Sequence, residues 1–304
     1  MGNLAIDKIL GRAAAAITYQ REKSRKDVVH TVPEGVEEIL DIPYKTRDGK
    51  ELCMDVYKPV TEKGTELPVI VCVHGGALFL GSHRMSQGGG ELLAQRGYLV
   101  CSLEYRLLPS VNVYEQVADI CAGMDFVAKY LLNFDVDYSR LYMVAESAGA
   151  YLATYAVAMH YSRMLTEAIG YEASRMRFRA MALISGMFYT KKWDIVGFLA
   201  LSMYGMDERS VRIAPYTNPE HPQVIYNLPP CLLVTSKADF IQHYTYEFGR
   251  ALGENGIDHE ILDMGEDKRL THSFFFLHPD YPESAVVADR IAEWFRKYEP
   301  KQGK

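Results

Sequence analysis

Cysteine is scarce in this sequence, and the few cysteines present show no sign of pairing. The 304 residues contain five, at Cys53, Cys72, Cys101, Cys121 and Cys231. No two of them form a Cys-x-x-Cys pair, the count is odd, and a chain of this length does not need disulfide staples. We therefore exclude a disulfide framework and predict buried thiols in a protein of a reducing compartment.

Long apolar runs and blocks of like charge are lacking as well. No stretch approaches the roughly 18 consecutive apolar residues of a membrane helix, so we expect no membrane span. The net charge of -6 is mild and the basic residues are scattered, which argues against nucleic acid as a partner. Charges at Asp7, Lys8 and Arg12 break the apolar core that a secretory signal needs, and this favours a cytoplasmic location.

The composition, 48% hydrophobic and 24% charged, is that of a globular protein able to bury a large core. Apolar and polar residues alternate over 36–44 and 51–57, as in half-buried strands, and Asp48-Gly49 between them predicts a hairpin turn. Two later runs, 68–73 and 98–103, are apolar almost throughout. Continuous apolar strands joined by helices indicate a mostly parallel sheet that is covered on both faces.

This alternation continues along the chain with one interruption. We predict an N-terminal helical segment over 1–35, with a helix over 5–26. Further helices are predicted over 90–96, 114–132, 148–161, 241–255 and 282–298. Further strands are predicted over 141–145, 181–184, 230–235 and 259–262. Residues 186–228 show no clean period, and we predict that they form a cap over the working edge of the sheet. No repeat or low-complexity linker divides the chain, so we expect one α/β domain over 1–304.

The strongest local motif surrounds Ser147. An apolar strand leads through small residues, Ala145-Glu-Ser-Ala-Gly149, into a helix. This is the context of a nucleophile elbow, where small neighbours allow a tight turn that lifts the serine hydroxyl clear of the backbone. The usual pattern begins with Gly, and Ala145 departs from it. The alternative is that Ser147 only caps the helix that follows.

A second motif lies about seventy residues earlier, where an apolar strand runs into His74-Gly75-Gly76-Ala77. A glycine-rich loop exposes backbone N–H groups, which can hold the oxyanion that forms when an ester carbonyl is attacked. We predict Gly75, Gly76 and Ala148 as the donors. Taken alone, the same residues are also consistent with a simple turn after a strand.

Together with three further stretches, these two motifs resemble the hormone-sensitive-lipase-like and feruloyl-esterase-like carboxylesterases, branches of the α/β-hydrolases. The matching pieces extend from His74 to Ser82, from Glu104 to Pro109, from Glu146 to Gly149, from Leu228 to Val234 and from Thr271 to Phe274. The resemblance implies the α/β-hydrolase fold and a Ser-acid-His triad, and it implies that His74 braces the oxyanion loop. Ala77, Ala145 and Ser273 stand where the family usually has Gly.

The acid and the base follow from chain order, because this fold places the serine first, then the acid, then the histidine. His272 comes after every predicted strand, whereas His278 next to Pro279 is interpreted as a packing or surface residue. Asp239 lies just past the strand that ends near Thr235, at the edge where open parallel sheets bind ligands. It could instead cap the following helix, and the fallback acids are Asp263 and Asp267.

Two nearby residues carry no catalytic prediction. His83 lacks a metal-binding partner four residues on, so we expect no metal, and Glu146 is interpreted as structural. The cap interval is rich in large side chains that suit either an acyl or aryl pocket or plain packing, namely Phe188, Tyr189, Trp193, Phe198, Met203, Tyr204 and Met206.

These expectations converge on a serine carboxylesterase that hydrolyses small or medium acyl or aryl esters through an acyl-serine intermediate, with no cofactor. The same residues would serve an arylformamidase-like amidase or a carbohydrate deacetylase, and a silent binding scaffold is a further alternative. The expected partner is a small-molecule ester. Whether the chain forms a homodimer stays open.

Overall fold

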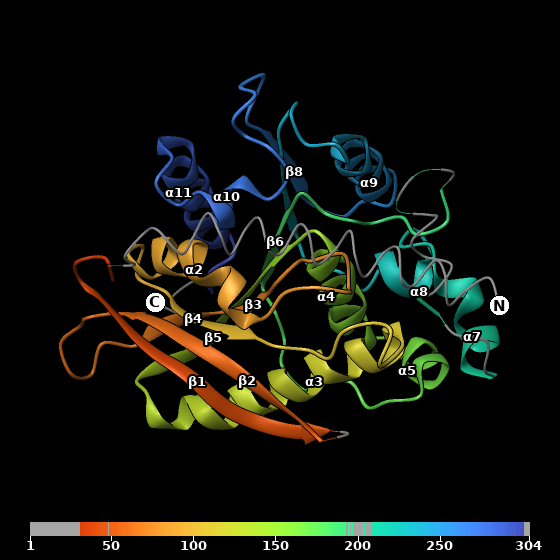
Figure 1. Cartoon of the computed structure of the whole chain (residues 1–304), viewed down its shortest axis with the longest axis horizontal. Coiled ribbons are helices and arrows are strands. Elements are labelled where there is room, and N and C mark those ends of the chain that lie inside the picture. Colours follow the sequence, from red (N-terminus) through yellow and green to blue (C-terminus); the bar gives the residue numbers. More distant parts are fainter. Residues whose placement is uncertain are drawn as a thin grey trace.

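One eight-stranded sheet runs through the computed structural model, which describes residues 31–47, 49–192, 194, 196, 203–204 and 208–300. The strands are β1 (Val36–Arg47), β2 (Lys50–Pro59), β3 (Leu67–Val73), β4 (Leu99–Leu103), β5 (Val136–Glu146), β6 (Ala180–Ile184), β7 (Cys231–Thr235) and β8 (His259–Asp263). Their spatial order is β1-β2-β4-β3-β5-β6-β7-β8 (Figure 1). β2 pairs antiparallel with β1 and β4, and all the other pairings are parallel. The mostly parallel sheet is therefore confirmed.

Helices cover both faces of this sheet (Figure 1). They are α2 (Gln87–Ala94), α3 (Val113–Tyr130), α4 (Ala148–Met159), α5 (Arg163–Ile169), α7 (Glu208–Ile213), α8 (Pro222–Ile225), α9 (Gln242–Glu254), α10 (Phe274–Leu277) and α11 (Pro282–Lys297), with 3-10 turns η1 (His83–Ser86), η2 (Leu131–Asn133) and η4 (Ala214–Tyr216). One hydrophobic core contains residues of α3, α4 and α9, and the other contains residues of α2, α10 and α11.

The central strand β3 shows why its sequence is apolar throughout. Val69, Val71 and Val73 belong to the core that packs under α3 and α4. Ile70 and Cys72, between them, belong to the core under α11. Because successive side chains of a strand point to opposite faces, a strand buried on both sides needs apolar residues at every position.

Most predicted elements lie within a few residues of the observed ones. Strand β5 is longer than predicted, because its first residues, 136–140, are partly exposed and so lack a continuous apolar signal. The hairpin turn is confirmed by the pairing of Arg47 with Lys50 and by the positive φ of +76° at Gly49. The short helices α5 and α10 were not predicted, and the predicted helix over 5–26 lies outside the described residues.

The interval 186–228 connects β6 to β7, and its described parts lie against α3 and α4. Tyr204 is the main link, because its hydroxyl lies 2.5 Å from that of Tyr151 on α4 and its carbonyl accepts from Tyr114 on α3 at 2.8 Å. Phe188 stacks on Phe248 of α9 with ring centroids 4.2 Å apart. These aromatics pack against the body of the protein. Trp193, Phe198 and Met206 lie outside the described residues.

The cysteines are all unpaired, as predicted. Four of them are buried, whereas Cys53 on β2 is only partly buried, which corrects the expectation that every thiol is buried. Among the helices that the structure describes, none is long and apolar enough to cross a membrane.

Candidate active site

Three side chains predicted from chain order form a continuous hydrogen-bonded chain at the carboxyl edge of the sheet. Ser147 follows β5, Asp239 follows β7 and His272 follows β8. The Ser147 Oγ lies 2.8 Å from His272 Nε2, and His272 Nδ1 lies 2.8 Å from Asp239 Oδ1. Because a carboxylate only accepts, Nδ1 carries the proton toward Asp239, and Nε2 is left to accept from the Ser147 hydroxyl.

The backbone at Ser147 adopts the sharp turn that its small neighbours predict. Its φ of 50° and ψ of -119° are unusual for a residue with a side chain. Two hydrogen bonds hold this conformation, from Ser147 N to Ile184 O at 2.9 Å and from Met187 N to Ser147 O at 3.0 Å. Although Ser147 stands at the N-cap position of α4, its side chain makes no capping hydrogen bond. The hydroxyl is directed to the histidine instead.

Asp239 is enclosed, and its carboxylate is held by several donors. Its side chain has no exposed surface, and Oδ1 also accepts from Ile241 N at 3.1 Å. Burial acts to raise the pKa of Asp239, but hydrogen bonding to His272 and its charge, followed by hydrogen bonds from Ser185 and Ile241, lower it below its usual range. Helix α9 begins at Gln242 with Ile241 as its N-cap, so Asp239 does not cap it.

The other candidates for acid and base lie elsewhere. Asp263 accepts from the hydroxyl of Tyr246 at 2.5 Å, and Asp267 pairs with Arg269. The ring of His278 stacks on Tyr281 with centroids 4.6 Å apart. Each of these groups has a partner that accounts for its position.

The loop after β3 and the turn at Ser147 pack so closely that both Gly75 and Gly149 must be glycine. A Cβ added to Gly75 would lie 3.0 Å from Ser147 Cβ and 2.8 Å from the Oε1 of the buried Glu146. A Cβ on Gly149 would lie 2.4 Å from the carbonyl oxygens of Val73 and His74. Only glycine fits at both positions, so the loop after β3 lies directly against the first turn of α4. Gly75 is thereby next to Ser147.

The next residues of this loop are also in strained conformations. Gly76 has a φ of +108°, and a Cβ there would lie 2.1 Å from the carbonyl oxygen of Leu80. Ala77 and Leu78 have φ values of 52° and 69°, in the left-handed region that favours glycine. The departure from a third Gly at Ala77 therefore costs backbone strain, although the loop keeps its course.

His74 and Tyr105 hold the carbonyl groups of the same loop. The His74 Nδ1–H donates to Gly75 O at 2.7 Å, and the Tyr105 hydroxyl lies 3.0 Å from His74 O and 3.2 Å from Gly75 O. Each of these carbonyls shares a planar peptide group with the N–H of the following residue, which points the opposite way. Anchoring the carbonyls of His74 and Gly75 therefore orients the N–H groups of Gly75 and Gly76.

The same two rings stack, with centroids 4.3 Å apart and an interplanar angle of 11°. Burial lowers the pKa of His74 to about 4, although the hydrogen bond to Gly75 opposes this. His74 is therefore neutral near pH 7 and acts as a hydrogen-bond donor rather than a charge.

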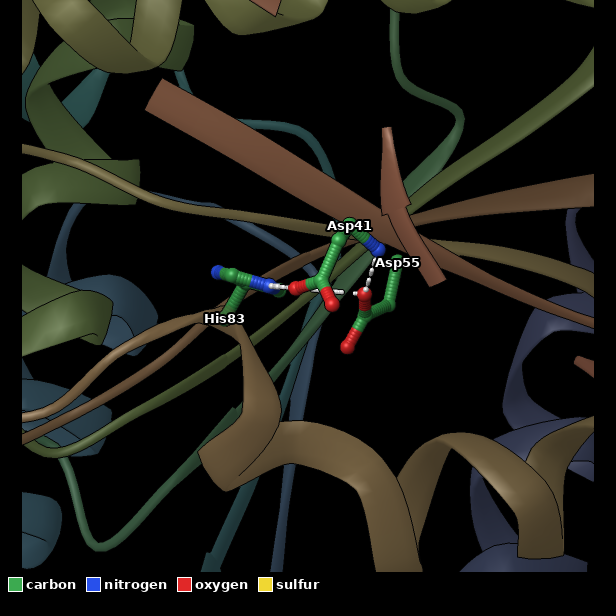
Figure 2. A group of neighbouring side chains, drawn as sticks. All are labelled: Asp41, Asp55 and His83. Atoms are coloured by element: carbon green, nitrogen blue, oxygen red, sulfur yellow. Dashed lines mark hydrogen bonds and ion pairs between the residues drawn. The ribbon is translucent and has the colours of Figure 1, made fainter. Parts of the chain in front are cut away.

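A second polar cluster lies behind this loop, between β1, β2 and η1. His83, Asp41 and Asp55 face one another (Figure 2), and their ligand atoms lie within 4.8 Å, a donor set that a divalent metal can use. The His83 Nδ1 faces Glu104 at 3.1 Å. Burial would lower the pKa of His83, but its bonds to Asp55 and Glu104 raise it to about 9. A metal would have to displace this proton, so we interpret the cluster as an ion-pair site centred on a cationic His83.

Comparison with known proteins agrees with this architecture. The family model BD-FAE matches residues 54–194, a range that includes the glycine loop and Ser147. Among solved structures, esterase B from Lactobacillus Rhamnosis superposes with a TM-score of 0.86 at 21% identity, over 98% of this chain and 97% of that chain. The chain therefore has the α/β-hydrolase fold. A bacterial heroin esterase has the same fold, with a TM-score of 0.71 at 19% identity, over 96% of this chain and 92% of that one.

Curated relatives of this chain include plant methylesterases. The probable isoprenylcysteine alpha-carbonyl methylesterase ICMEL1 of Arabidopsis thaliana is 24% identical over 197 residues, or 62% of this chain and 41% of that protein. The isoprenylcysteine alpha-carbonyl methylesterase ICME of the same plant is 32% identical over 125 residues, or 41% of this chain and 29% of that protein. The chain therefore spans less than half the length of these curated relatives.

Sequence reasoning did not find three residues that contact the candidate site or its support. Tyr105 belongs to the stretch Glu104–Pro109 that carried the resemblance, but the stretch itself gave no indication of a role. Ser185 follows β6 at the same sheet edge as Ser147, and that position was the available signal. His83 was examined only as a ligand with a partner on its own helix, whereas its partners come from other strands.

Proposed function

We propose that this chain is a serine carboxylesterase that acts on small or medium acyl or aryl esters. The observation that carries the proposal is the chain of two 2.8 Å hydrogen bonds from Ser147 through His272 to Asp239, beside the loop of Gly75 and Gly76. This arrangement of nucleophile, base, acid and adjacent N–H groups suits acyl transfer.

In the first step, the Ser147 Oγ attacks the ester carbonyl carbon while its proton passes to His272 Nε2. The carbonyl oxygen becomes an oxyanion, and in this proposal the N–H groups of Gly75, Gly76 and Ala148 hold it. The C–O bond to the leaving alcohol then breaks, and His272 gives its proton to that alcohol. Asp239 stabilises the positive charge on His272 between these two transfers.

The second step repeats the same chemistry with water. His272 takes a proton from water as the water oxygen attacks the acyl-serine, and it returns the proton to Ser147 as the bond to the serine breaks. The products are a carboxylic acid and the free enzyme, so the cycle balances without a cofactor. Ala148 is the first residue of α4, where backbone N–H groups have no intrahelical acceptor and the helix dipole favours a negative charge.

The names of related proteins support the ester bond as the target. Esterase B is described in a form inhibited by a tributyrin phosphonate, and the plant relatives are named as methylesterases. We propose that residues 186–228 act as a cap that limits the size of the acyl or alcohol group. Support comes from the described part of this interval, where Tyr204 and Phe188 pack against α3, α4 and α9.

The test is hydrolysis of p-nitrophenyl esters from acetate to decanoate, with tributyrin as a triacylglycerol. Ser147→Ala and His272→Ala should each lower kcat by roughly 10⁴-fold or more, and His278→Gln, which changes a histidine outside the hydrogen-bonded chain, should leave kcat within about twofold. Activity that survives in Ser147→Ala would refute the proposal. Wild-type activity on aryl amides or acetylated sugars, with none on any p-nitrophenyl ester or on tributyrin, would replace the proposed substrate class with that of an amidase or a carbohydrate deacetylase.

A further inference from the structure

The turn after β6, at Ser185, touches all three loops of the candidate site. Ser185 is buried and has a φ of 50°, a strained value for a residue with a side chain. Its N–H donates to Val234 O on β7 at 2.8 Å. Its neighbours Ile184 and Met187 make the two backbone hydrogen bonds that hold Ser147. The turn is therefore attached to both the nucleophile and the strand that precedes the acid.

The Ser185 hydroxyl joins the remaining two loops. Its Oγ accepts from the N–H of Ser273 at 3.1 Å, and Ser273 is the residue that follows the base His272. The loop of the base is thereby attached to the turn that holds Ser147. Hydrogen bonding from Ser185 is also one of the effects that lower the pKa of Asp239.

We infer that Ser185 is a positioning residue, whose hydroxyl fixes the loop that carries the base His272 relative to the turn that holds Ser147. The inference rests on the proposed function, because a fixed distance between base and nucleophile matters for proton transfer from Ser147. The backbone bond from Ser185 to Val234 ties the same turn to β7, the strand that precedes Asp239.

The residue type fits this role. A larger side chain would not fit in a turn that is 2% exposed, and a β-branched residue is strongly disfavoured at positive φ. Alanine would fit, but it would leave the buried N–H of Ser273 without its acceptor. Serine is therefore a small residue that also supplies the acceptor for this N–H.

The experiment compares Ser185→Ala and Ser185→Gly with the matched control Ser273→Ala. Ser273 also has a positive φ, of 62°, and lies in the same cluster, but its buried hydroxyl has no hydrogen-bond partner among the described residues. The readouts are kcat and KM on p-nitrophenyl butyrate and the rate at which a p-nitrophenyl phosphonate modifies Ser147. A third readout is the far-downfield proton resonance of the His272–Asp239 hydrogen bond, identified by its loss in His272→Ala.

Both Ser185 variants should lower kcat and the phosphonylation rate about tenfold and keep KM within about twofold of wild type. They should also shift or broaden the downfield resonance. Ser273→Ala should match wild type in all three readouts. Ser185→Gly relieves the strained φ, so a folded variant without the hydroxyl is secured. Active-site titration normalises every rate to the folded enzyme. Wild-type rates in both variants, or losses equal to those of Ser273→Ala, would overturn the inference.

The two proposals fail in different ways. If wild type neither hydrolyses esters nor reacts with the phosphonate, the esterase proposal is wrong, and the resonance still decides the role of Ser185. If wild type is active and the resonance is unchanged in Ser185→Ala, the esterase proposal stands and the positioning role is refuted.

Discussion

The cationic His83 should make the fold less stable in mildly alkaline solution. Its side chain is 7% exposed, with Nδ1 3.1 Å from Glu104 and Nε2 3.2 and 3.4 Å from Asp41 and Asp55. Burial opposes the charge, but these partners raise the pKa of His83 from 6.5 to about 9. At about 1.4 kcal/mol per pKa unit, this difference corresponds to about 3 kcal/mol of folding free energy.

The sign follows from comparing folded and unfolded chains. The folded pKa is the higher one, so the stabilisation is complete below a pH of about 6.5 and is lost as the pH rises through about 9. When His83 loses its proton, the three carboxylates around it repel one another. Two cations limit this repulsion, because Lys50 pairs with Glu104 and Arg84 pairs with Asp41. The loss should therefore weaken the protein without unfolding it.

Urea unfolding of wild type and His83→Gln, from a pH of about 6 to about 10, measures this contribution. The gap in unfolding free energy should be about 3 kcal/mol at the acidic end and should close toward zero at the alkaline end. The control is His243→Gln, at a histidine whose side chain is 58% exposed, which should change the unfolding free energy by no more than about 0.5 kcal/mol. A gap that stays constant for His83→Gln would refute the reasoning.

Three further substitutions test the candidate site through kcat on p-nitrophenyl butyrate. Asp239→Asn should lower kcat about 10⁴-fold, because an amide favours the wrong tautomer of the base, and a loss under tenfold would place the acid elsewhere. Gly76→Ala should lower kcat about 10²-fold, because its Cβ would lie 2.1 Å from a backbone oxygen and displace the loop. The control is Gly97→Ala, which also has a positive φ, of +91°, but whose added Cβ would have no atom within 4 Å, and it should keep wild-type kcat. Tyr105→Phe keeps the stacked ring and should lower kcat about tenfold, while the lost hydrogen bonds lower the melting temperature by only about 2 °C. An unchanged kcat would remove Tyr105 from the support of the loop.

The sheet and the three hydrogen-bonded residues were predictable because their signals are local. Strands buried on both faces are continuous apolar runs, and the residues just past their carboxyl ends share one edge of the sheet. Ser147, Asp239 and His272 each stand at such a position. Asp263 satisfies the same chain order, and the spacing implied by the family resemblance favoured Asp239 over it.

The supporting residues were not predictable because their partners lie far away in the sequence. Tyr105 bonds to carbonyls 30 and 31 residues earlier, and Ser185 accepts from an N–H 88 residues later. Such bonds have no period and no local composition. The same holds for His83, whose carboxylate partners stand on three different strands or strand ends.

The wide spacing of the hydrogen-bonded residues also has a consequence for how the protein folds. Ser147 and His272 are 125 residues apart, and Asp239 and His272 are 33 apart. Contacts between such distant residues form slowly, because a long stretch of chain must be ordered before they can meet. Recovery of activity during refolding should therefore lag behind recovery of helical circular dichroism, and that lag would time the arrival of the last strand, β8, at the edge of the sheet.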